Sequence, residues 1–291
     1  MTVGNTTTGA LADSLNDIIV SARIVREYEG IMPGVVDKQT LSEGSGLDWN
    51  EISLDQLSAQ AVTETTELDN PQQIADTLFS ITPTVIGIHT VITDRVKKRI
   101  APIVYAKIGA LSQNAIQRKK DEDGITVLDG GTSLCGAGAT LSSGYITAAA
   151  TRIQGNSTEP GKLPINCVLH PYQIKDILNE LISGVGTFPV DESGITARAF
   201  RDAYVGKIGG VNIFSDGNIT VDASSDAKGG VFAKEAIVLV QGRSPWVESE
   251  RNPALGGGAD VYYVYDEYAY GERSAGNWLF EIYSDATAPT S

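Results

Sequence analysis

Cysteine and histidine are scarce in this chain of 291 residues, which contains two of each. Cys135 and Cys167 form no CxxC pair, so the sequence offers no disulfide scaffold, and both fit a reducing cytosol as small buried side chains. His89 is expected near the apolar face of a long helix, as a core or interface residue. His170 has no accompanying nucleophile motif, and Cys167, on the same strand, is expected to face the other way. The sequence therefore gives no nucleophilic pair that we would assign to catalysis.

Long apolar runs and an excess of basic charge are also missing. No stretch of about eighteen apolar residues could span a membrane, and the N-terminus lacks the basic and apolar regions of a signal peptide. The formal net charge is −14 and the pI is about 4.5, which argues against a nucleic-acid reader and favours solubility at high local concentration. The hydrophobic content of 42% and the charged content of 20% are those of a globular protein. The length allows one large domain or two modest ones.

The motifs of common enzyme classes are absent or incomplete. The Gly136-Ala-Gly138 sequence lacks the third glycine of a dinucleotide fingerprint, because Leu141 stands in that place. There is no Walker motif, HExxH or GxSxG. Asp216, Asn218 and Asp222 do not have the spacing of an EF-hand, so we interpret them as turn residues.

The clustered acidic residues do not indicate acid–base chemistry either. The pair Asp266/Glu267 and the run 121–123 have no apolar sequence around them that would raise a pKa. We therefore expect no catalytic residues, no cofactor and no metal.

The segment Thr82–Asp123 is interpreted as one long helix. Thr82 is a suitable N-cap, Pro83 suits the first helical position, and Pro102 is expected to bend the helix. About 37 residues would give a rod of roughly 55 Å, long for a compact domain. Apolar residues recur at steps of three and four: Val85, Ile88, Ile92, Val96, Ile100, Val104, Ile108, Leu111 and Ala115.

This segment also carries concentrated positive charge. Between positions 95 and 120 there are eight basic residues and no acidic one, so the rest of the −14 chain carries −22. Such charge fits either a solvated helix face or a contact with an acidic partner. The candidates for an inter-subunit or DNA contact, with one aromatic residue added, are Arg95, Lys97, Lys98, Arg99, Lys107, Arg118, Lys119, Lys120 and Trp49.

The chain before this segment has two parts. Residues 11–29 show one apolar face, typical of a helix that must dock on something, and Gly30 and Pro33 are expected to end it. Residues 36–76 hold nine acidic residues and one basic residue. They are interpreted as a long hairpin or extended loop with little apolar content, and a disordered acidic insertion is the alternative.

The chain after this segment reads as a mixed α+β body. Short strands are expected over 125–131, 163–170 and 229–240, with a helix over 172–183 and a short helix over 196–205. Gly209 and Gly210 are expected to form a turn between two strands. Residues 261–283 hold six of the eleven tyrosines and are interpreted as a C-terminal hairpin.

This order of elements resembles the major capsid proteins of tailed bacteriophages, which have the Hong Kong 97-like fold. The resemblance covers almost the whole chain. The stretches that carry it are ITDRVKKRIAPIVYAKIGALSQNAIQRKKDEDG (92–124), similar to a spine-helix region, LPINCVLHPYQIKDIL (163–178), similar to a strand, proline and helix segment, and GKIGGVNIFSDGNI (206–219) and VFAKEAIVLV (231–240), similar to later strands.

The resemblance implies an α+β fold with four parts. These are an N-terminal arm, an extended loop lying over a neighbouring subunit, a peripheral domain with a long spine helix and a β-hairpin, and a mixed α+β axial domain. Their expected ranges are 1–35 for the arm, 36–75 for the loop, 76–133 and 258–291 for the peripheral domain, and 134–257 for the axial domain.

The resemblance also implies a structural, non-enzymatic function. Such subunits form hexamers and pentamers that close into an icosahedral shell around double-stranded DNA, as the capsid of a virion assembled in the host bacterial cytoplasm. The expected partners are other copies of the chain, a portal, a separate scaffolding protein (since the chain opens at Met1 with the arm) and DNA bound non-specifically. No membrane contact is expected. Lys38 is the only loop lysine, and nothing marks a cross-linking partner for it.

Two alternatives stay open from the sequence. An encapsulin, a bacterial nanocompartment shell of the same fold, differs in carrying an enzyme cargo instead of DNA. A cytosolic enzyme or binding protein with an unrecognised site would be a monomer or small oligomer with a closed pocket, and would leave the extended loop without a partner.

Overall fold

The computed structural model of the chain describes residue 28 and residues 30–44, 46–65, 71–99, 102–185, 204–254, 257–274 and 276–290. The helix expected over 11–29 lies outside these residues, apart from Tyr28, which has no regular structure. The helix expected over 196–205 also lies outside them, except for its last two residues, which begin a strand. In the described part of the chain, no helix is long and apolar enough to cross a membrane.

The chain forms two compact units. Among the described residues, unit 1 comprises Val85–Lys119 and Ser244–Asp266, and unit 2 comprises Gly30–Thr84, Lys120–Arg243 and the residues from Glu267 onward. The boundary falls within four elements: β4 (Thr84–Thr93), after its first residue, α4 (Pro102–Leu128), β10 (Ile237–Asn252) and β11 (Ala259–Glu272).

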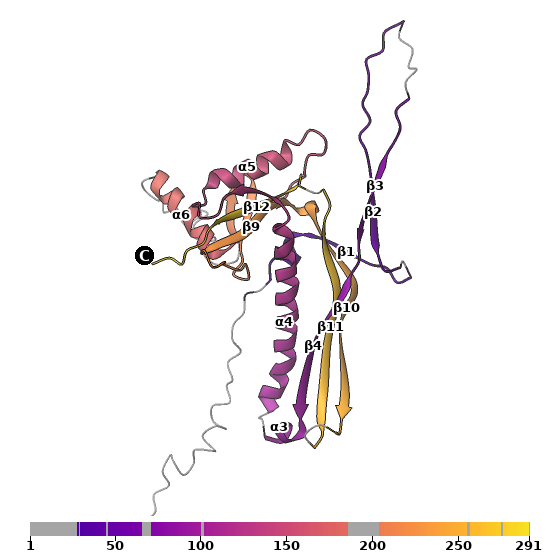
Figure 1. Cartoon of the computed structure of the whole chain (residues 1–291), viewed down its shortest axis with the longest axis vertical. Coiled ribbons are helices and arrows are strands. Elements are labelled where there is room, and N and C mark those ends of the chain that lie inside the picture. The colour runs from indigo at the N-terminus through magenta and orange to yellow at the C-terminus, as the bar shows by residue number, and fades with distance from the viewer. Residues whose placement is uncertain are drawn as a thin grey trace, which may run out of the picture. The chain divides into compact units, whose positions relative to one another are not determined.

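A six-stranded mixed sheet is the centre of unit 2 (Figure 1). The helix α5 (Ser143–Gln154) packs on it through Ile146, Ala149, Ala150 and Ile153. All five residues of β6 are buried, as expected for an inner strand. The strand order is β5 (Thr132–Cys135), β12 (Leu279–Asp285), β9 (Asp226–Ala233), β6 (Ile165–Leu169), β8 (Val211–Ser215) and β7 (Tyr204–Ile208).

Two local predictions for this unit are confirmed. The strand expected over 163–170 is β6, and Pro171 begins the helix α6 (Pro171–Val185) that follows it. Gly209 and Gly210, with φ of 56° and 87°, form the turn between β7 and β8, where a side chain would be strained. The stretch 229–240 is interrupted by a 3-10 turn, η1 (Lys234–Ala236), which separates β9 from β10.

The single helix expected over Thr82–Asp123 is wrong in its first part. The chain instead forms β4 (Thr84–Thr93), then α3 (Asp94–Arg99), then α4. Eight of the ten residues in β4 are Val, Ile or Thr, whose branched side chains favour strands over helices. Pro102 begins α4 instead of bending a longer helix, and the 27 residues of α4 span about 40 Å.

The short strand expected over 125–131 is also wrong, because α4 continues to Leu128. The Leu128 side chain is fully buried and lies so close to Gly230 that a Cβ there would meet its Cδ2 at 3.1 Å. Tertiary packing of this side chain therefore outweighs the strand preference of the Ile-Thr-Val sequence before it.

The prediction of a C-terminal hairpin is wrong as well, because the two strands belong to different sheets. β11 lies in a four-stranded sheet of order β1-β10-β11-β4, where β1 (Asp37–Thr40) pairs with β10 in parallel. β12 lies between β5 and β9 in the six-stranded sheet. The burial patterns explain the difference: β11 alternates between buried and partly exposed residues at its start, whereas the first four residues of β12 are all buried.

Candidate assembly surfaces

A two-stranded ribbon, β2 (Trp49–Leu54) with β3 (Asp76–Ile81), occupies the acidic stretch expected as an extended loop (Figure 1). The strands are antiparallel, from Trp49 opposite Ile81 to Leu54 opposite Asp76. They form a sheet of their own, and the described residues between them, 55–65 and 71–75, are all exposed. The hairpin interpretation is therefore confirmed, and a two-stranded ribbon of this kind is only marginally stable by itself in water.

Large apolar side chains are concentrated on this hairpin without being covered. Of the thirteen exposed large hydrophobic residues in the described chain, seven lie between positions 47 and 78. Apolar groups gathered on one exposed element are typical of a surface that is buried in a complex. They are Leu47, Ile52, Leu54, Leu57, Val62, Ile74 and Leu78.

The base of the hairpin is fixed within unit 2. The Trp49 ring contacts Phe79 edge to face, at 6.2 Å between centroids, and the guanidinium of Arg273 lies 5.9 Å from the Trp49 ring centre. Arg273 Nε donates to Glu51 at 2.7 Å, and another of its nitrogens pairs with Asp37 at 2.9 Å. The Trp49 side chain is half-buried here, so we expect it to anchor the hairpin; its contact with another subunit stays a prediction.

Replacing Trp49 by alanine should loosen the hairpin without unfolding the chain. Loss of the half-buried ring should cost about 2 kcal/mol and should raise the amide exchange rates across the β2–β3 pairs, measured by hydrogen–deuterium exchange. The matched control is Leu54→Ala at the far end of β2, because Leu54 is 70% exposed. Equal effects of the two variants would show that Trp49 does not anchor the base.

The predicted basic residues fall on two helices instead of one. Arg95 and Lys98 are exposed on α3, and Arg118 and Lys119 are exposed on α4. Lys97 and Arg99 belong to α3 and Lys107 to α4, and the structure describes only their backbone. The contact of these residues with a neighbour or with DNA stays a prediction.

Lys120 does not belong with the exposed basic residues. It is 6% exposed, its Nζ donates to Gln241 at 2.5 Å and lies 4.6 Å from the centre of the Tyr268 ring. A lysine held in this way contributes to the packing of unit 2, so its assignment as a surface contact is wrong. The sequence alone could not separate it from Lys119, because both continue the same basic run.

The start of α3 is held by an arginine from β10. Arg251 pairs with Asp94 at the beginning of α3 and with Asp260 at 2.8 Å on β11, and these carboxylates raise the pKa of Arg251. The Asp94 N–H donates to the carbonyl of Gly258 at 2.8 Å. Gly258 has a φ of 112°, and a Cβ there would lie 2.6 Å from both Arg251 and Asp94. The basic α3 helix is thus tied to the β10–β11 turn at a position that requires glycine.

Gly258→Ala should therefore lower the free energy of unfolding by about 2 to 3 kcal/mol, since strain at positive φ adds to the clash. Gly257→Ala is the control, because Gly257 has a φ of 83° but no neighbouring atom within 4 Å. Thermal unfolding of the unassembled variants measures both effects. If the two variants lose the same stability, the ion-pair cluster does not crowd position 258.

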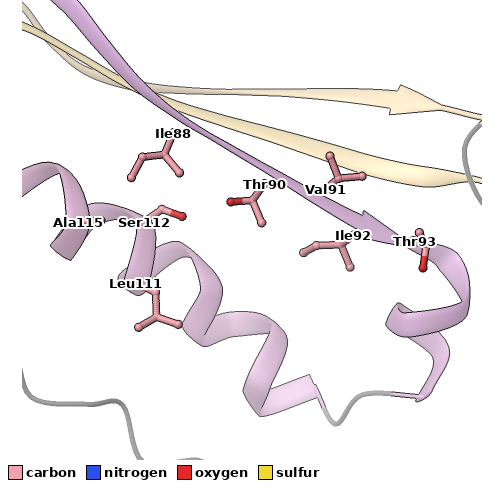
Figure 2. A pocket seen from close by; sticks show the side chains of 8 residues that line it. All are labelled: Ile88, Thr90, Val91, Ile92, Thr93, Leu111, Ser112 and Ala115. Atoms are coloured by element: carbon pink, nitrogen blue, oxygen red, sulfur yellow. The ribbon is translucent and has the colours of Figure 1, made fainter.

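A cavity of about 520 Å³ lies in unit 1, between β4 and α4 (Figure 2). Its lining contains no side chain that titrates and only the hydroxyls of Thr90, Thr93 and Ser112 as side-chain polar groups. In Figure 2 the side chains of Ile88, Thr90 and Ile92 extend from the strand towards the helix. The described lining residues therefore supply no acid, base or strong nucleophile.

Neither histidine forms a catalytic pair in the described structure. His170 is 8% exposed, burial lowers its pKa, and its Nδ1 accepts the Tyr172 N–H at 3.2 Å. Cys167 is fully buried, which raises the pKa of its thiol and disfavours the reactive thiolate. His89 was expected in a helix but is exposed on β4, with its ring stacked on Tyr263 at 5.0 Å.

The aspartates considered for a calcium loop form turns. Asp216 accepts the Asn218 N–H at 2.9 Å, and Asp222 accepts the N–H groups of Ser224 and Asp226 at 2.8 and 3.0 Å. These are Asx turns, as predicted. Among the described residues, no group of three or more histidine, cysteine or acidic side chains is arranged to hold a metal.

The sequence reasoning missed one buried acidic pair. Asp121 and Asp216 are both fully buried, although the run 121–123 was expected to have no environment that would raise a pKa. Burial and the neighbouring Asp121 raise the pKa of Asp216 to about 7. The signal that could have located Asp121 is the spacing of Ile116, Gly124 and Leu128, which places position 121 near the buried face of α4.

No protein-family model and no curated protein sequence matches this chain. Solved structures match it in fold. The capsid of Ralstonia phage GP4 aligns with a TM-score of 0.68 and 12% identity, over 88% of each chain. The capsid of the cyanophage P-SCSP1u gives a TM-score of 0.68 and 14% identity, over 98% of this chain and 97% of the other. A structure of Mycobacterium phage Che8 gives 0.65 and 15%, over 91% and 95%. The chain therefore has the mixed α+β fold of bacteriophage capsid proteins, as its sequence resemblance predicted.

Proposed function

We propose that the chain is the major capsid protein of a tailed bacteriophage and that it assembles as hexamers and pentamers into an icosahedral shell around double-stranded DNA. The observation that carries the proposal is the β2–β3 hairpin, which exposes seven large apolar side chains in a chain with a phage capsid fold. Burial against neighbouring copies gives those side chains the environment that they lack in the single chain. The role is structural, with no catalytic step.

The division of the chain into the four structural parts of the family is also part of this proposal. We assign residues 1–35 to an arm, 36–75 to the extended loop, 76–133 and 258–291 to the peripheral domain, and 134–257 to the axial domain. These ranges differ from the two compact units of the single chain, since contacts within one copy need not follow the roles that segments have in a shell.

The charges of the chain suggest which surfaces meet. The hairpin segment 36–76 carries nine acidic residues and one basic residue. The exposed Arg95, Lys98, Arg118 and Lys119 provide positive charge on α3 and α4. We propose that these basic side chains contact the hairpin of an adjacent subunit or the packaged DNA. A separate scaffolding protein and a portal complete the assembly, which takes place in the host bacterial cytoplasm.

Sedimentation velocity of the full-length chain tests this proposal. Alone, the 30.8 kDa chain should form capsomers of five or six copies or larger particles, and coexpression with the proteins encoded beside it should shift the material to shells. A single species of the monomer's mass in both samples would overturn the proposal.

A further inference from the structure

Asp121 on α4 and Asp216 after β8 form a buried pair of carboxyl groups in unit 2. Asp121 Oδ1 accepts the Met32 N–H at 2.9 Å, and its Oδ2 accepts the Asn218 side-chain amide at 2.8 Å. Asp216 Oδ1 accepts the Asn218 backbone N–H at 2.9 Å. Three of the four carboxyl oxygens therefore have donors from the protein, and the chain entering α2 (Met32–Val35) is attached to one of them.

The fourth oxygen, Asp216 Oδ2, is buried and has no partner at ordinary hydrogen-bond geometry, although the nearby Ile31 N–H, like that of Asn218, acts to lower the pKa of Asp216. A fully buried carboxylate oxygen without a donor is costly, and two adjacent buried carboxylates repel one another. One proton relieves both costs, because a protonated Asp216 can donate to Asp121. A bound cation fits less well, since hard cations need six or more oxygen ligands and three of these oxygens already accept hydrogen bonds.

We infer that Asp121 and Asp216 share one proton and that this proton determines how firmly residues 30–32 are attached to α4 and to the end of β8. The attachment is close: a Cβ at Gly30 would lie 2.7 Å from the Asp121 Cβ, and the Met32 side chain is fully buried. This inference does not depend on the proposed function.

Among the residues that the structure describes around the pair, the charged groups are engaged elsewhere. Residues 30–36 contain no titratable side chain. On α4, Lys120 donates to Gln241 and Asp123 accepts the Tyr268 hydroxyl. The Asp216 N–H donates to the carbonyl of Leu169 on β6, and burial lowers the pKa of the adjacent His170, which disfavours its charged form.

The direction of the pH dependence follows from the pKa of Asp216, which burial and Asp121 raise to about 7, against an ordinary value of 3.8. When the segment opens, Asp216 returns towards its ordinary pKa and loses the proton. Between these two pKa values the closed state therefore holds a proton that the open state lacks, so acid tightens the attachment. The opening constant should rise about tenfold per pH unit up to about pH 7 and level off above it.

Hydrogen–deuterium exchange of the full-length chain tests the inference. After correction for the intrinsic exchange rate, protection of the Ile31 and Met32 amides should fall about fiftyfold from pH 5 to pH 7, because the tenfold rise per unit in the opening constant is already half levelled at the pKa. Asp216→Asn keeps the acceptor for Asn218 and places an amide donor where the proton was. In this variant, protection at pH 7 should exceed that of the wild type by at least about tenfold and should not change with pH. Glu43→Gln, which removes an exposed carboxylate, should behave as the wild type.

Infrared spectroscopy of the wild type gives a second readout that does not depend on any variant. A protonated carboxyl band should be present at pH 5.5 and lost with a midpoint near pH 7, and Asp216→Asn should lack it. The inference is overturned if wild-type protection of residues 31–32 is constant from pH 5 to 7, if Asp216→Asn shows the same pH dependence, or if the band is absent at pH 5.5.

Discussion

Removing residues 55–75 and joining Leu54 to Asp76 through an Asn-Gly turn should leave a folded chain that forms no closed shells. The deletion retains every β2–β3 pair, and an Asn-Gly turn matches the twist of an antiparallel hairpin. None of the removed residues in the described range is buried, so the fold of both units should survive.

The expected loss is large because the deletion removes apolar side chains that the proposed interface would bury. Leu57, Val62 and Ile74 are between 53% and 61% exposed. At about 1.5 to 3 kcal/mol for each fully buried side chain, their loss weakens each contact by roughly 5 kcal/mol, which is several thousandfold in affinity. A shell repeats this contact at every subunit, so partial assembly is not expected.

Particle yield after gradient sedimentation measures whether closed shells form. Circular dichroism of the soluble chain measures whether it is still folded. A control with Leu57, Val62 and Ile74 changed to serine keeps the loop length and should lose shells for the same reason. Normal particles from the deletion would mean that the tip makes no necessary contact.

Reversing the four basic residues of α3, Arg95, Lys97, Lys98 and Arg99, to glutamate should leave the monomer folded and prevent assembly. Glutamate at positions 95 and 97, near the start of the six-residue α3, interacts favourably with the helix dipole, whereas glutamate at 98 and 99, near its end, interacts unfavourably. The two effects oppose one another, so α3 itself should tolerate the change. At a subunit interface with an acidic hairpin, each reversal replaces attraction by repulsion and slows association as well as weakening it.

Three outcomes separate the possible partners of α3. Loss of shells, with partial recovery when Glu43 and Glu64 of the hairpin segment are changed to lysine, supports the contact between subunits. Shells that form at normal yield but package less DNA indicate that α3 faces the nucleic acid. Unchanged shells with unchanged DNA content would remove α3 from both interfaces. Reversal of Arg118 and Lys119 is the matched test for the exposed end of the basic run on α4.

Where local sequence and tertiary packing agree, the fold could be predicted. The β6 strand and the α6 helix behind Pro171 have clear patterns, and Gly209-Gly210 marks the β7–β8 turn. The β2–β3 hairpin could be placed because a segment so acidic, in which apolar residues are only scattered, cannot build a core of its own.

The sequence-based predictions of secondary structure were wrong where one residue pattern is compatible with two structures. Val85, Ile88 and Ile92 follow helical spacing, yet the intervening Ile86, Thr90 and Thr93 are also β-branched and favour a strand. In the structure, partly buried Ile86, Ile88 and Thr90 alternate with exposed neighbours at the period of two that a strand has. Likewise, the two aromatic strands at the C-terminus look like a hairpin because nothing in their local sequence shows that β12 inserts between β5 and β9.

The candidate surfaces were predictable only in part. The basic run identified the exposed Arg95, Lys98, Arg118 and Lys119, but it also included Lys120, which tertiary contacts bury beside Tyr268. The Asp121–Asp216 pair could not be found in advance, because it depends on two elements 95 residues apart in sequence coming together beside the start of α2. Long-range pairs of this kind are set by the fold and not by local pattern.

Electron microscopy of the purified full-length chain, prepared with and without the proteins encoded beside its gene, tests the central claim most directly. The account predicts closed icosahedral shells or rings of five and six subunits, with the β2–β3 hairpin of each copy lying on its neighbour. Single 30.8 kDa chains or small closed oligomers in both preparations would contradict it.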